Sequence, residues 1–190
     1  MPRTERLMLL DTASMYFRAF FGVPEILAPD GTPVNAVRGL LDFISRLVEQ
    51  YEPRDLVCCW DDDWRPQWRV DLVPTYKAHR VEEEVEPAPD VEEVPDPLQV
   101  QVPIIRDVLA AYGIKVVGAP EAEADDVIGT LARLATESGR DAVISTGDKD
   151  MAQLVNQHIT LVNTMKGETL DVAGVEAKFG IPPSLIIDYL

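Results

Sequence analysis

Residues 114–139 read IKVVGAPEAEADDVIGTLARLATESG, and the character of this segment changes once along its length. The apolar run at 114–120 is typical of a buried strand, whereas residues 121–139 show helical spacing of apolar positions and end at a glycine. A strand that leads into a helix is the repeating unit of α/β proteins. At the junction, residues 121–126 carry four carboxylates and no basic residue, a concentration of charge that needs a physical explanation.

The same two kinds of segment alternate along the rest of the chain. Further strands are predicted at residues 6–11, at 55–61, within 141–150, and at 158–163. Further helices are predicted at residues 12–22, 35–51, the second half of 98–113, 170–180 and 182–190. In the helix at 35–51, Leu40, Ile44, Leu47 and Val48 are expected on one apolar face. Alternating strands and helices predict an α/β fold with a mostly parallel sheet covered by helices on both faces.

The 190 residues allow one well-buried core, so residues 1–190 are expected to form a single domain. Adjacent Cys58 and Cys59 lie in a predicted strand and point to opposite faces of it. They are interpreted as small core residues of a protein in a reducing cytosol, not as a disulfide or a metal site. No segment resembles a signal peptide or a membrane span, so a cytoplasmic location and no membrane partner are expected.

The net charge of −16, from 17 basic and 33 acidic residues, argues against a passive nucleic-acid binder, which needs a basic surface. Half of this charge comes from residues 82–96, which hold eight carboxylates and no basic residue. That stretch is rich in Glu and Pro and has too little apolar surface to fold alone. We therefore predict a flexible acidic loop at about residues 81–97, and the remaining acid requires a separate explanation.

The remaining acid is concentrated where strands end. Four successive predicted strands are followed by acids: Asp11 after the first, Asp61, Asp62 and Asp63 after the second, Glu123, Asp125 and Asp126 after the third, and Asp148 and Asp150 after the fourth. In open α/β sheets, ligands bind beyond the carboxyl ends of the strands. These side chains are therefore predicted to meet at one edge of the sheet.

The energetics of such a cluster favour bound cations. An acid in the first turn of a helix gains only ~0.3–1 kcal/mol, whereas two unpaired carboxylates about 4 Å apart repel by roughly 4 kcal/mol at an effective dielectric constant near 20. Either the acids splay into water or cations lie between them. Oxygen ligands without His or Cys suit Mg²⁺ or Mn²⁺ rather than Zn²⁺. Two such ions, roughly 3.5–4 Å apart, would stabilise in-line attack on a phosphodiester.

Several basic residues lie near this edge in sequence terms, namely Arg18, Arg69, Lys77 and Arg80. Such side chains could contact phosphate oxygens or stabilise developing negative charge. For Arg69 and Arg80, a solvated surface position is an equal alternative. That alternative is weaker for Lys77, which lies in an aromatic-flanked motif. His79 and His158 are assigned no role.

Five motifs together resemble the bacterial 5′-nuclease (flap endonuclease) family: LLD with YFRAFFG, WDDDWRPQWR, YKAHR, EAEADDVIGTLA and STGDKDMAQLV. That family includes the 5′→3′ exonuclease domain of DNA polymerase I and free-standing relatives, and the DWRP variant resembles the actinobacterial free-standing members. The resemblance implies a PIN-like α/β fold. It also implies Mg²⁺- or Mn²⁺-dependent hydrolysis of DNA or RNA at 5′ ends, nicks, flaps and junctions, including RNA–DNA hybrids. A link to DNA polymerase I and ligase in replication and repair is implied as well.

The resemblance also implies residue roles. The first metal ion would be held by Asp11, Asp61, Glu123 and Asp125, with Asp63 a rival to Asp61 because WDDDWRP is one residue longer than the usual motif. The second would be held by Asp148 and Asp150 with Asp125, and with Asp126 as a further candidate. Lys77 would polarise the scissile phosphate, and Arg18 would contact phosphate. Arg69 and Arg80 are candidate nucleic-acid contacts, whereas Glu121 falls outside the match.

Two departures from the family pattern bear on activity. The family's arch over the site usually carries basic and apolar residues, but here the corresponding region is the acidic stretch at 82–96, a disordered flank or a gate against unsuitable substrates. The family also continues with a Gly-Asp-x-x-Asp-Asn stretch and a helix–turn–helix-like element that grips duplex DNA, and neither lies within the 190 residues. We therefore expect a fragment whose second metal site lacks a ligand and whose cleavage is weak or absent.

Three other functions are compatible with parts of the sequence. In a phosphatase of the haloacid dehalogenase type, Asp61 and Asp63 would be nucleophile and acid and GDKD would supply the metal acids, but Asp11, Glu123, Asp125 and Asp126 would have no role. A PIN-like module could bind metal or nucleic acid without cutting. An acidic protein-interaction domain has only residues 82–96 in its favour.

Overall fold

The computed structural model describes residues 5–83, 91–92, 94–164 and 166–189, and its centre is a six-stranded sheet in the order β5-β2-β1-β6-β7-β8. These strands are β1 (Leu7–Asp11), β2 (Asp55–Cys59), β5 (Lys115–Val117), β6 (Ala142–Ser145), β7 (Ile159–Asn163) and β8 (Glu168–Leu170). All neighbours pair in parallel except β7 and β8, which are antiparallel. The predicted mostly parallel sheet is confirmed. Strand β8 was not predicted, because three residues are too few to show a periodicity.

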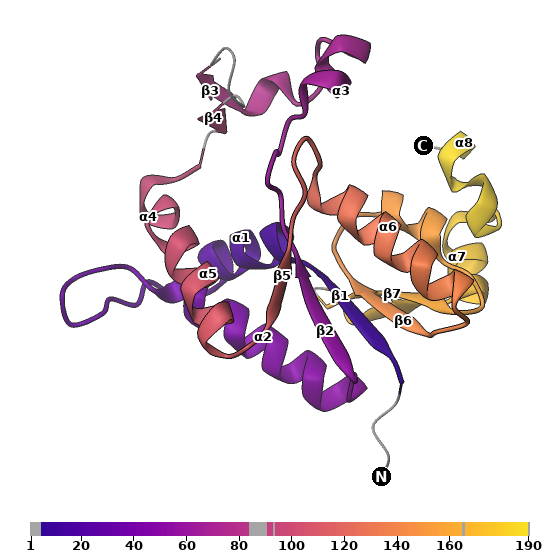
Figure 1. Ribbon diagram of the computed structural model, residues 1–190, viewed down its shortest axis with the longest axis horizontal. Coiled ribbons are helices and arrows are strands. Elements are labelled where there is room, and N and C mark those ends of the chain that lie inside the picture. The colour runs from indigo at the N-terminus through magenta and orange to yellow at the C-terminus, as the bar shows by residue number, and fades with distance from the viewer. Residues whose placement is uncertain (1–4, 84–90, 93, 165, 190) are drawn as a thin grey trace.

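Helices cover both faces of the sheet, as Figure 1 shows. One face carries α1 (Thr12–Gly22), α2 (Asn35–Tyr51) and α5 (Gln101–Ala111), and the other carries α6 (Ala124–Glu137), α7 (Val172–Phe179) and α8 (Ile186–Tyr189). Two apolar clusters form the core, one on each side of the sheet. Cys58 belongs to the cluster under α2 and Cys59 to the cluster under α6, and both are buried free thiols, as predicted.

The predicted apolar face of α2 is correct except at one residue. Leu40, Ile44 and Leu47 are buried, whereas Val48 is 40% exposed. Successive residues of an α-helix are about 100° apart around its axis. Val48 therefore lies outside the buried face of the helix, and Leu47 is at the edge of that face.

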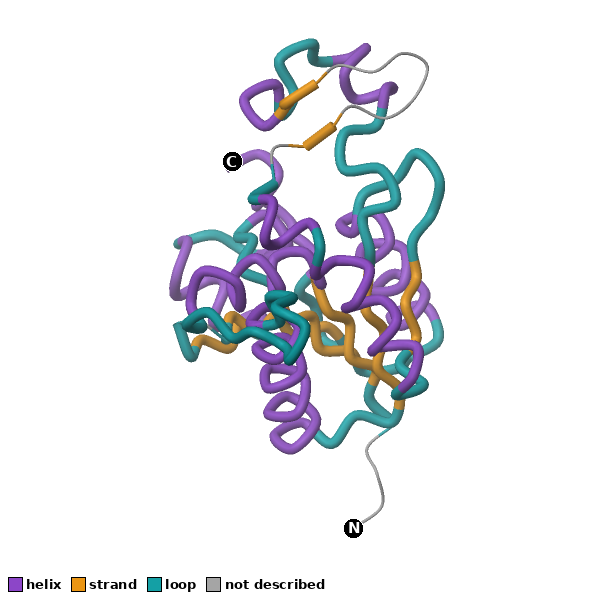
Figure 2. Tube along the Cα trace, turned by 90° about the vertical axis from the view of Figure 1, so that its left-hand side faces the viewer, coloured by secondary structure: helices purple, strands orange, loops and turns teal. Residues whose placement is uncertain are grey.

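The part of the chain between β2 and α4 (Asp96–Gln99) stands apart from the main sheet, as Figures 1 and 2 show. It contains α3 (Gln67–Leu72), the 3-10 turn η1 (Ala78–Arg80), β3 (Val81–Glu83) and β4 (Val91–Glu92). Helix α4 packs on the core through the buried side chain of Leu98. Strands β3 and β4 pair antiparallel. The predicted acidic loop therefore contains short paired strands among its described residues, and its flexibility stays a prediction. Residues 84–90 and 93 of that loop lie outside the described residues.

Candidate active site

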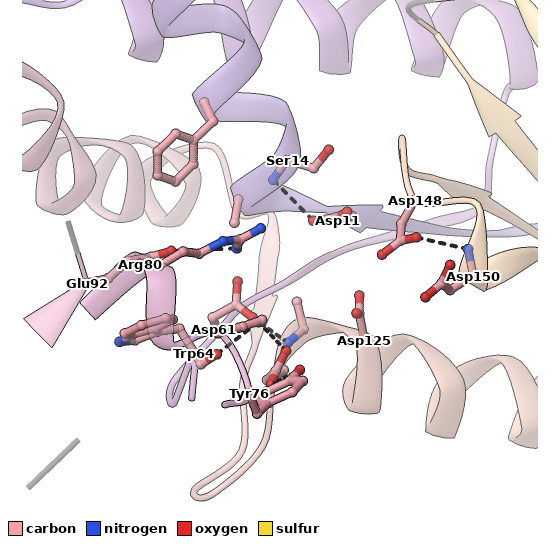
Figure 3. A pocket seen from close by; sticks show the side chains of 15 residues that line it. Asp11, Ser14, Asp61, Trp64, Tyr76, Arg80, Glu92, Asp125, Asp148 and Asp150 are labelled. Atoms are coloured by element: carbon pink, nitrogen blue, oxygen red, sulfur yellow. Dashed lines mark hydrogen bonds and ion pairs between the residues drawn. The ribbon is translucent and has the colours of Figure 1, made fainter. Parts of the chain in front are cut away.

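A pocket of about 740 Å³ lies at the carboxyl ends of β1, β2 and β6 (Figure 3). Six of the predicted metal-site carboxylates line it: Asp11, Asp61, Glu123, Asp125, Asp148 and Asp150. They come from four separate strand ends, because the parallel strands point the same way and deliver their following residues to one edge. The structure thus brings together side chains that lie far apart in the sequence, and their role as metal ligands stays a prediction.

Asp11 is the last residue of β1 and caps the helix that follows. Its Oδ1 accepts a hydrogen bond from the Ser14 amide at 3.1 Å, and its Oδ2 accepts one from Thr146 Oγ1 at 2.6 Å. The same Thr146 hydroxyl accepts a hydrogen bond from the Asp148 amide at 3.0 Å. Burial raises the pKa of Asp11, and the two hydrogen bonds oppose this shift. Thr146, which the sequence analysis did not single out, therefore joins the end of β1 to the turn after β6.

The structure separates the two rival aspartates after β2. Asp61 Oδ1 accepts a hydrogen bond from the Ala124 amide at 2.8 Å, which ties the end of β2 to the first residue of α6. Asp63 is 9% exposed, and its Oδ1 accepts from the Arg65 amide at 3.1 Å within its own turn. Only Asp61 lines the pocket. Of the two, Asp61 is therefore the residue in position to act there.

Glu123 is the most extensively paired carboxylate of the pocket. It accepts a hydrogen bond from the Tyr76 hydroxyl at 2.7 Å, and it pairs with Lys77 Nζ at 2.5 Å and with Arg69 Nη1 at 2.9 Å. Lys77 Nζ also donates to the Trp64 carbonyl at 2.9 Å. The predicted cation Lys77 is thus held at the pocket through a predicted metal ligand.

The carboxylate of Asp125, in contrast, has no hydrogen bond or ion pair with any described residue. Burial raises its pKa to about 7, and the charges of neighbouring carboxylates, Asp11 foremost, add to the shift. Burial also raises the pKa of Asp61 and of Asp150. Folding therefore holds these carboxylates together against an electrostatic cost that a bound cation would remove.

The donor set fits a hard divalent ion. Among the described residues, the pocket lining includes no His and no Cys, and oxygen-only ligands suit Mg²⁺ or Mn²⁺. Within the described part of the chain, no three His, Cys, Asp or Glu side chains are gathered closely enough to form a metal cage by themselves. Mg²⁺ usually keeps several waters and takes only one or two carboxylates, so an open pocket lined by carboxylates suits such an ion.

Besides Asp63, three of the predicted site residues lie outside this pocket: Asp126, Arg69 and Arg18. Asp126 Oδ2 turns back to accept the Glu123 amide at 2.9 Å, and its carboxylate pairs with both terminal nitrogens of Arg69, at 3.0 and 2.8 Å. Arg18 Nη1 donates to Thr164 Oγ1 at 2.6 Å and lines a second cavity. Asp126 and Arg69 therefore support the start of α6, while Arg18 faces a different space.

The opposite wall of the pocket comes from the segment between β2 and β5. In Figure 3, Trp64, Tyr76, Arg80 and Glu92 lie on one side and Asp125, Asp148 and Asp150 on the other. Arg80 Nη1 lies 3.8 Å from Glu92 Oε1. The predicted contact Arg80 thus faces the acids. Trp64 and Glu92 carried no signal in the sequence, because the aromatic and acidic residues around them are equally plausible on a surface.

Within the described residues, every helix is too short or too polar to cross a lipid bilayer.

Comparison with known proteins identifies the family. Residues 6–180 match the family described as 5′-3′ exonuclease, N-terminal resolvase-like domain. A 5′-3′ exonuclease of Streptomyces coelicolor is 55% identical over 181 residues, covering 92% of this chain and 59% of the relative. A 5′-3′ exonuclease of Mycobacterium tuberculosis is 50% identical over 186 residues, covering 93% and 58%. DNA polymerase I of Pseudomonas aeruginosa is 44% identical over 184 residues, covering 97% and 19%.

Solved structures agree on the fold. T5 5′-exonuclease with bound divalent zinc ions has a TM-score of 0.71 at 14% identity, covering 96% of this chain and 64% of that one. The T5 flap endonuclease in a complex with DNA and metal ions has a TM-score of 0.66 at 12% identity, with the same coverage. The implied PIN-like α/β fold is confirmed. This chain spans less than two thirds of the length of the exonucleases it matches. By the match over residues 6–180 and by these identities, the chain belongs to the 5′-3′ exonuclease family, of which it carries the N-terminal resolvase-like domain.

Proposed function

We propose that this chain carries the catalytic centre of a divalent-metal-dependent 5′-nuclease that hydrolyses phosphodiester bonds in DNA or RNA. The observation that carries the proposal is the pocket in which carboxylates from four strand ends face Lys77 and Arg80. Relatives that are named 5′-3′ exonuclease, and solved relatives with metal ions, support it. The expected substrates are 5′ ends, nicks and flaps in DNA and RNA–DNA hybrids.

The pocket suggests how the ions would be held. Asp11, Asp61, Glu123 and Asp125 would hold the first Mg²⁺ or Mn²⁺ ion, and Asp148 and Asp150 with Asp125 would hold the second. When bound, such ions lower the pKa of a water molecule and stabilise the leaving oxygen of an in-line displacement. Hydrogen bonds from backbone amides to Asp11 and Asp61, and from the Thr146 hydroxyl to Asp11, hold these carboxylates in place before any substrate binds.

The cations across the pocket would position the phosphate. Lys77 is anchored by the Trp64 carbonyl and by Glu123, which leaves its remaining donor free to bind a phosphate oxygen. Arg80 is held only loosely by Glu92, at 3.8 Å, and would exchange that carboxylate for a phosphate. Tyr76 keeps Glu123 oriented by its 2.7 Å hydrogen bond.

The wider role follows the relatives' names. Relatives named DNA polymerase I contain a similar segment, so action alongside DNA polymerase I and ligase in replication and repair is part of this proposal. A cytoplasmic location stays a prediction from the two buried thiols. The phosphatase alternative is not favoured, because Asp63 faces the Arg65 amide and does not join Asp61 in the pocket.

Metal uptake and cleavage of a 5′-labelled flap in Mn²⁺ would test the function, with Asp148→Asn as the variant. Asp141→Asn is the matched control, since Asp141 precedes the amino end of the same strand and its side chain is 63% exposed. The variant should lose Mn²⁺ affinity and cleavage while it stays folded, and the control should keep both. Normal cutting by Asp148→Asn, or no uptake of Mn²⁺ by the wild type, would refute the proposal.

The assay should include a version of the chain extended by the segment that the resemblance calls for. Weak cleavage by residues 1–190 and strong cleavage by the extended chain are expected. DNA binding without cleavage by both versions would instead favour a non-cleaving module.

A further inference from the structure

A second cavity, of about 280 Å³, lies between α1, α2 and the β7–β8 pair. Its polar lining includes Arg18, Arg46, Gln50, Asn163, Thr164 and Thr169. None of the described residues that line it is acidic. In a chain with a net charge of −16, a cavity lined by two guanidinium groups and no carboxylate is suited to an anion.

The two arginines lack the charge partners that the other cations of the active-site region have. Neither Arg18 nor Arg46 forms an ion pair with a described carboxylate. Arg18 keeps one neutral partner, Thr164, and its Nε is buried with no hydrogen-bond partner among the described residues. Buried N–H groups are almost always satisfied by protein, water or an ion. Arg18 Nη2 also has no hydrogen-bond partner among the described residues, so this nitrogen has hydrogen-bonding capacity left for a ligand.

The cavity is a close neighbour of the acidic pocket. Gly147 lies between Thr146 and Asp148, and a Cβ at this position would stand 3.4 Å from Arg18 Nη2 and 3.6 Å from Ser14 Oγ. Ser14 lines the acidic pocket and Arg18 lines the cavity. A side chain at position 147 would therefore contact both a residue of the acidic pocket and a residue of the cavity.

We propose that this cavity is a phosphate subsite in which Arg18 and Arg46 bind one phosphate group while Thr164 and Thr169 contribute hydroxyl groups. Guanidinium groups match phosphate oxygens in geometry and keep their charge when partly buried. The volume admits a phosphate with an attached sugar. The inference rests on the proposed function, since the phosphate belongs either to the strand that reaches the acidic pocket or to a free phosphate ester such as a released product.

The first experiment measures binding of inorganic phosphate through the amide NMR shifts of Thr164, Gly167 and Thr169. Arg46→Gln is the variant, because Arg46 is exposed and forms no hydrogen bond or ion pair with a described residue. Arg38→Gln is the matched control, since Arg38 lies on the same helix, is equally exposed and lines a different groove. Wild type and control should show the same saturable shifts, and Arg46→Gln should weaken binding about tenfold.

The second experiment measures binding of a 5′-flap DNA as a function of salt, in an Asp148→Asn background that prevents cleavage. If the strand's own phosphate occupies the subsite, Arg46→Gln should lower the slope of log affinity against log salt by about 1, and Arg38→Gln should leave it unchanged. Binding of inorganic phosphate with an unchanged slope would assign the subsite to a free phosphate ester.

The inference is overturned if Arg46→Gln and Arg38→Gln behave alike in both experiments. These binding measurements do not depend on cleavage. Failure of the wild type to cut a flap would therefore count against the proposed function and leave the phosphate subsite to be judged by its own readouts.

Discussion

At the residue scale, Asp125 shows what the folded chain tolerates at this site. Its carboxylate is half-buried and has no partner among the described residues, and burial raises its pKa to about 7. The ordinary value for an aspartate in the unfolded chain is 3.8. The folded state therefore binds this proton more tightly than the unfolded state does. The stability that the proton contributes is fully present below about pH 4 and is lost as the pH rises through 7.

Asp125→Asn should therefore stabilise the metal-free protein at pH 8. After discounting for solvent screening, the expected gain in unfolding free energy is on the order of 2 kcal/mol, because each pKa unit corresponds to about 1.4 kcal/mol. At pH 5 the gain should be smaller. Urea unfolding at both pH values in the presence of a chelator measures this. A variant that is no more stable than the wild type at pH 8 would show that the charge of Asp125 is already compensated.

Asp61 and Asp63 are two residues apart in sequence but lie in different surroundings, so their substitutions should have different effects on metal binding and on stability. Asp61→Asn should abolish cleavage and weaken Mn²⁺ binding with little loss of stability, because Asp61 faces the pocket and burial already raises its pKa. Asp63→Asn should keep Mn²⁺ binding but cost about 1 kcal/mol of stability, because it weakens a hydrogen bond to the Arg65 amide. Calorimetric Mn²⁺ titration and urea unfolding of both variants measure this. The reverse pattern would make Asp63 the ligand.

At the scale of elements, the short hairpin of β3 and β4 brings part of the acidic segment to the active site. Glu92 of β4 lines the pocket beside Arg80, and the two side chains lie 3.8 Å apart. Burial raises the pKa of Glu92, and the charge of Arg80 opposes that shift. A carboxylate in this position competes with a phosphate for the same guanidinium. The acidic segment therefore acts on the site through at least this one residue.

Glu92→Gln should strengthen the binding of a 5′-flap DNA. One negative charge is removed from the pocket wall and Arg80 is freed, so KM should fall about threefold with kcat unchanged, an effect of the size that a weak exposed ion pair has. Asp96→Asn, in the same segment but exposed and outside the pocket, is the control and should change KM little. Steady-state cleavage in the extended chain measures both. A KM that is equal in the two variants would mean that Glu92 does not contact the substrate's path.

At the scale of the whole molecule, repulsion among carboxylates and its relief by cations should govern stability. Mn²⁺ that binds the native pocket and not the unfolded chain adds about 2.7 kcal/mol at a free concentration 100 times its dissociation constant. Thermal unfolding should therefore shift upward with Mn²⁺, and NaCl at matched ionic strength should shift it less. Asp148→Asn should reduce the Mn²⁺ effect, and Asp141→Asn should not. Equal shifts from Mn²⁺ and NaCl would indicate general screening in place of a specific site.

The local pattern of residues was sufficient to predict the α/β class and to predict that the acidic side chains gather at one edge of the sheet. The strand predicted at 114–120 and the helix after it indicate a parallel sheet. In a parallel sheet, the residues that follow the strands lie at one edge. Asp11, Asp125 and Asp148 were therefore expected at one edge of the sheet, and the strand order brings them to one pocket. Strand β8 and the β3–β4 pair were not predicted, because elements of two or three residues are too short to show a periodicity.

Which partner each charged side chain binds was decided only by the tertiary structure. Asp126 and Arg69 bind each other and leave the pocket, Arg18 turns to a second cavity, and Asp63 caps its own turn. Sequence spacing places a residue on an element, but long side chains reach several partners, and the choice among them follows from distances across the sheet and from burial. The periodicity of apolar residues is a local property of the chain, whereas electrostatic partners are chosen only when segments far apart in sequence pack together.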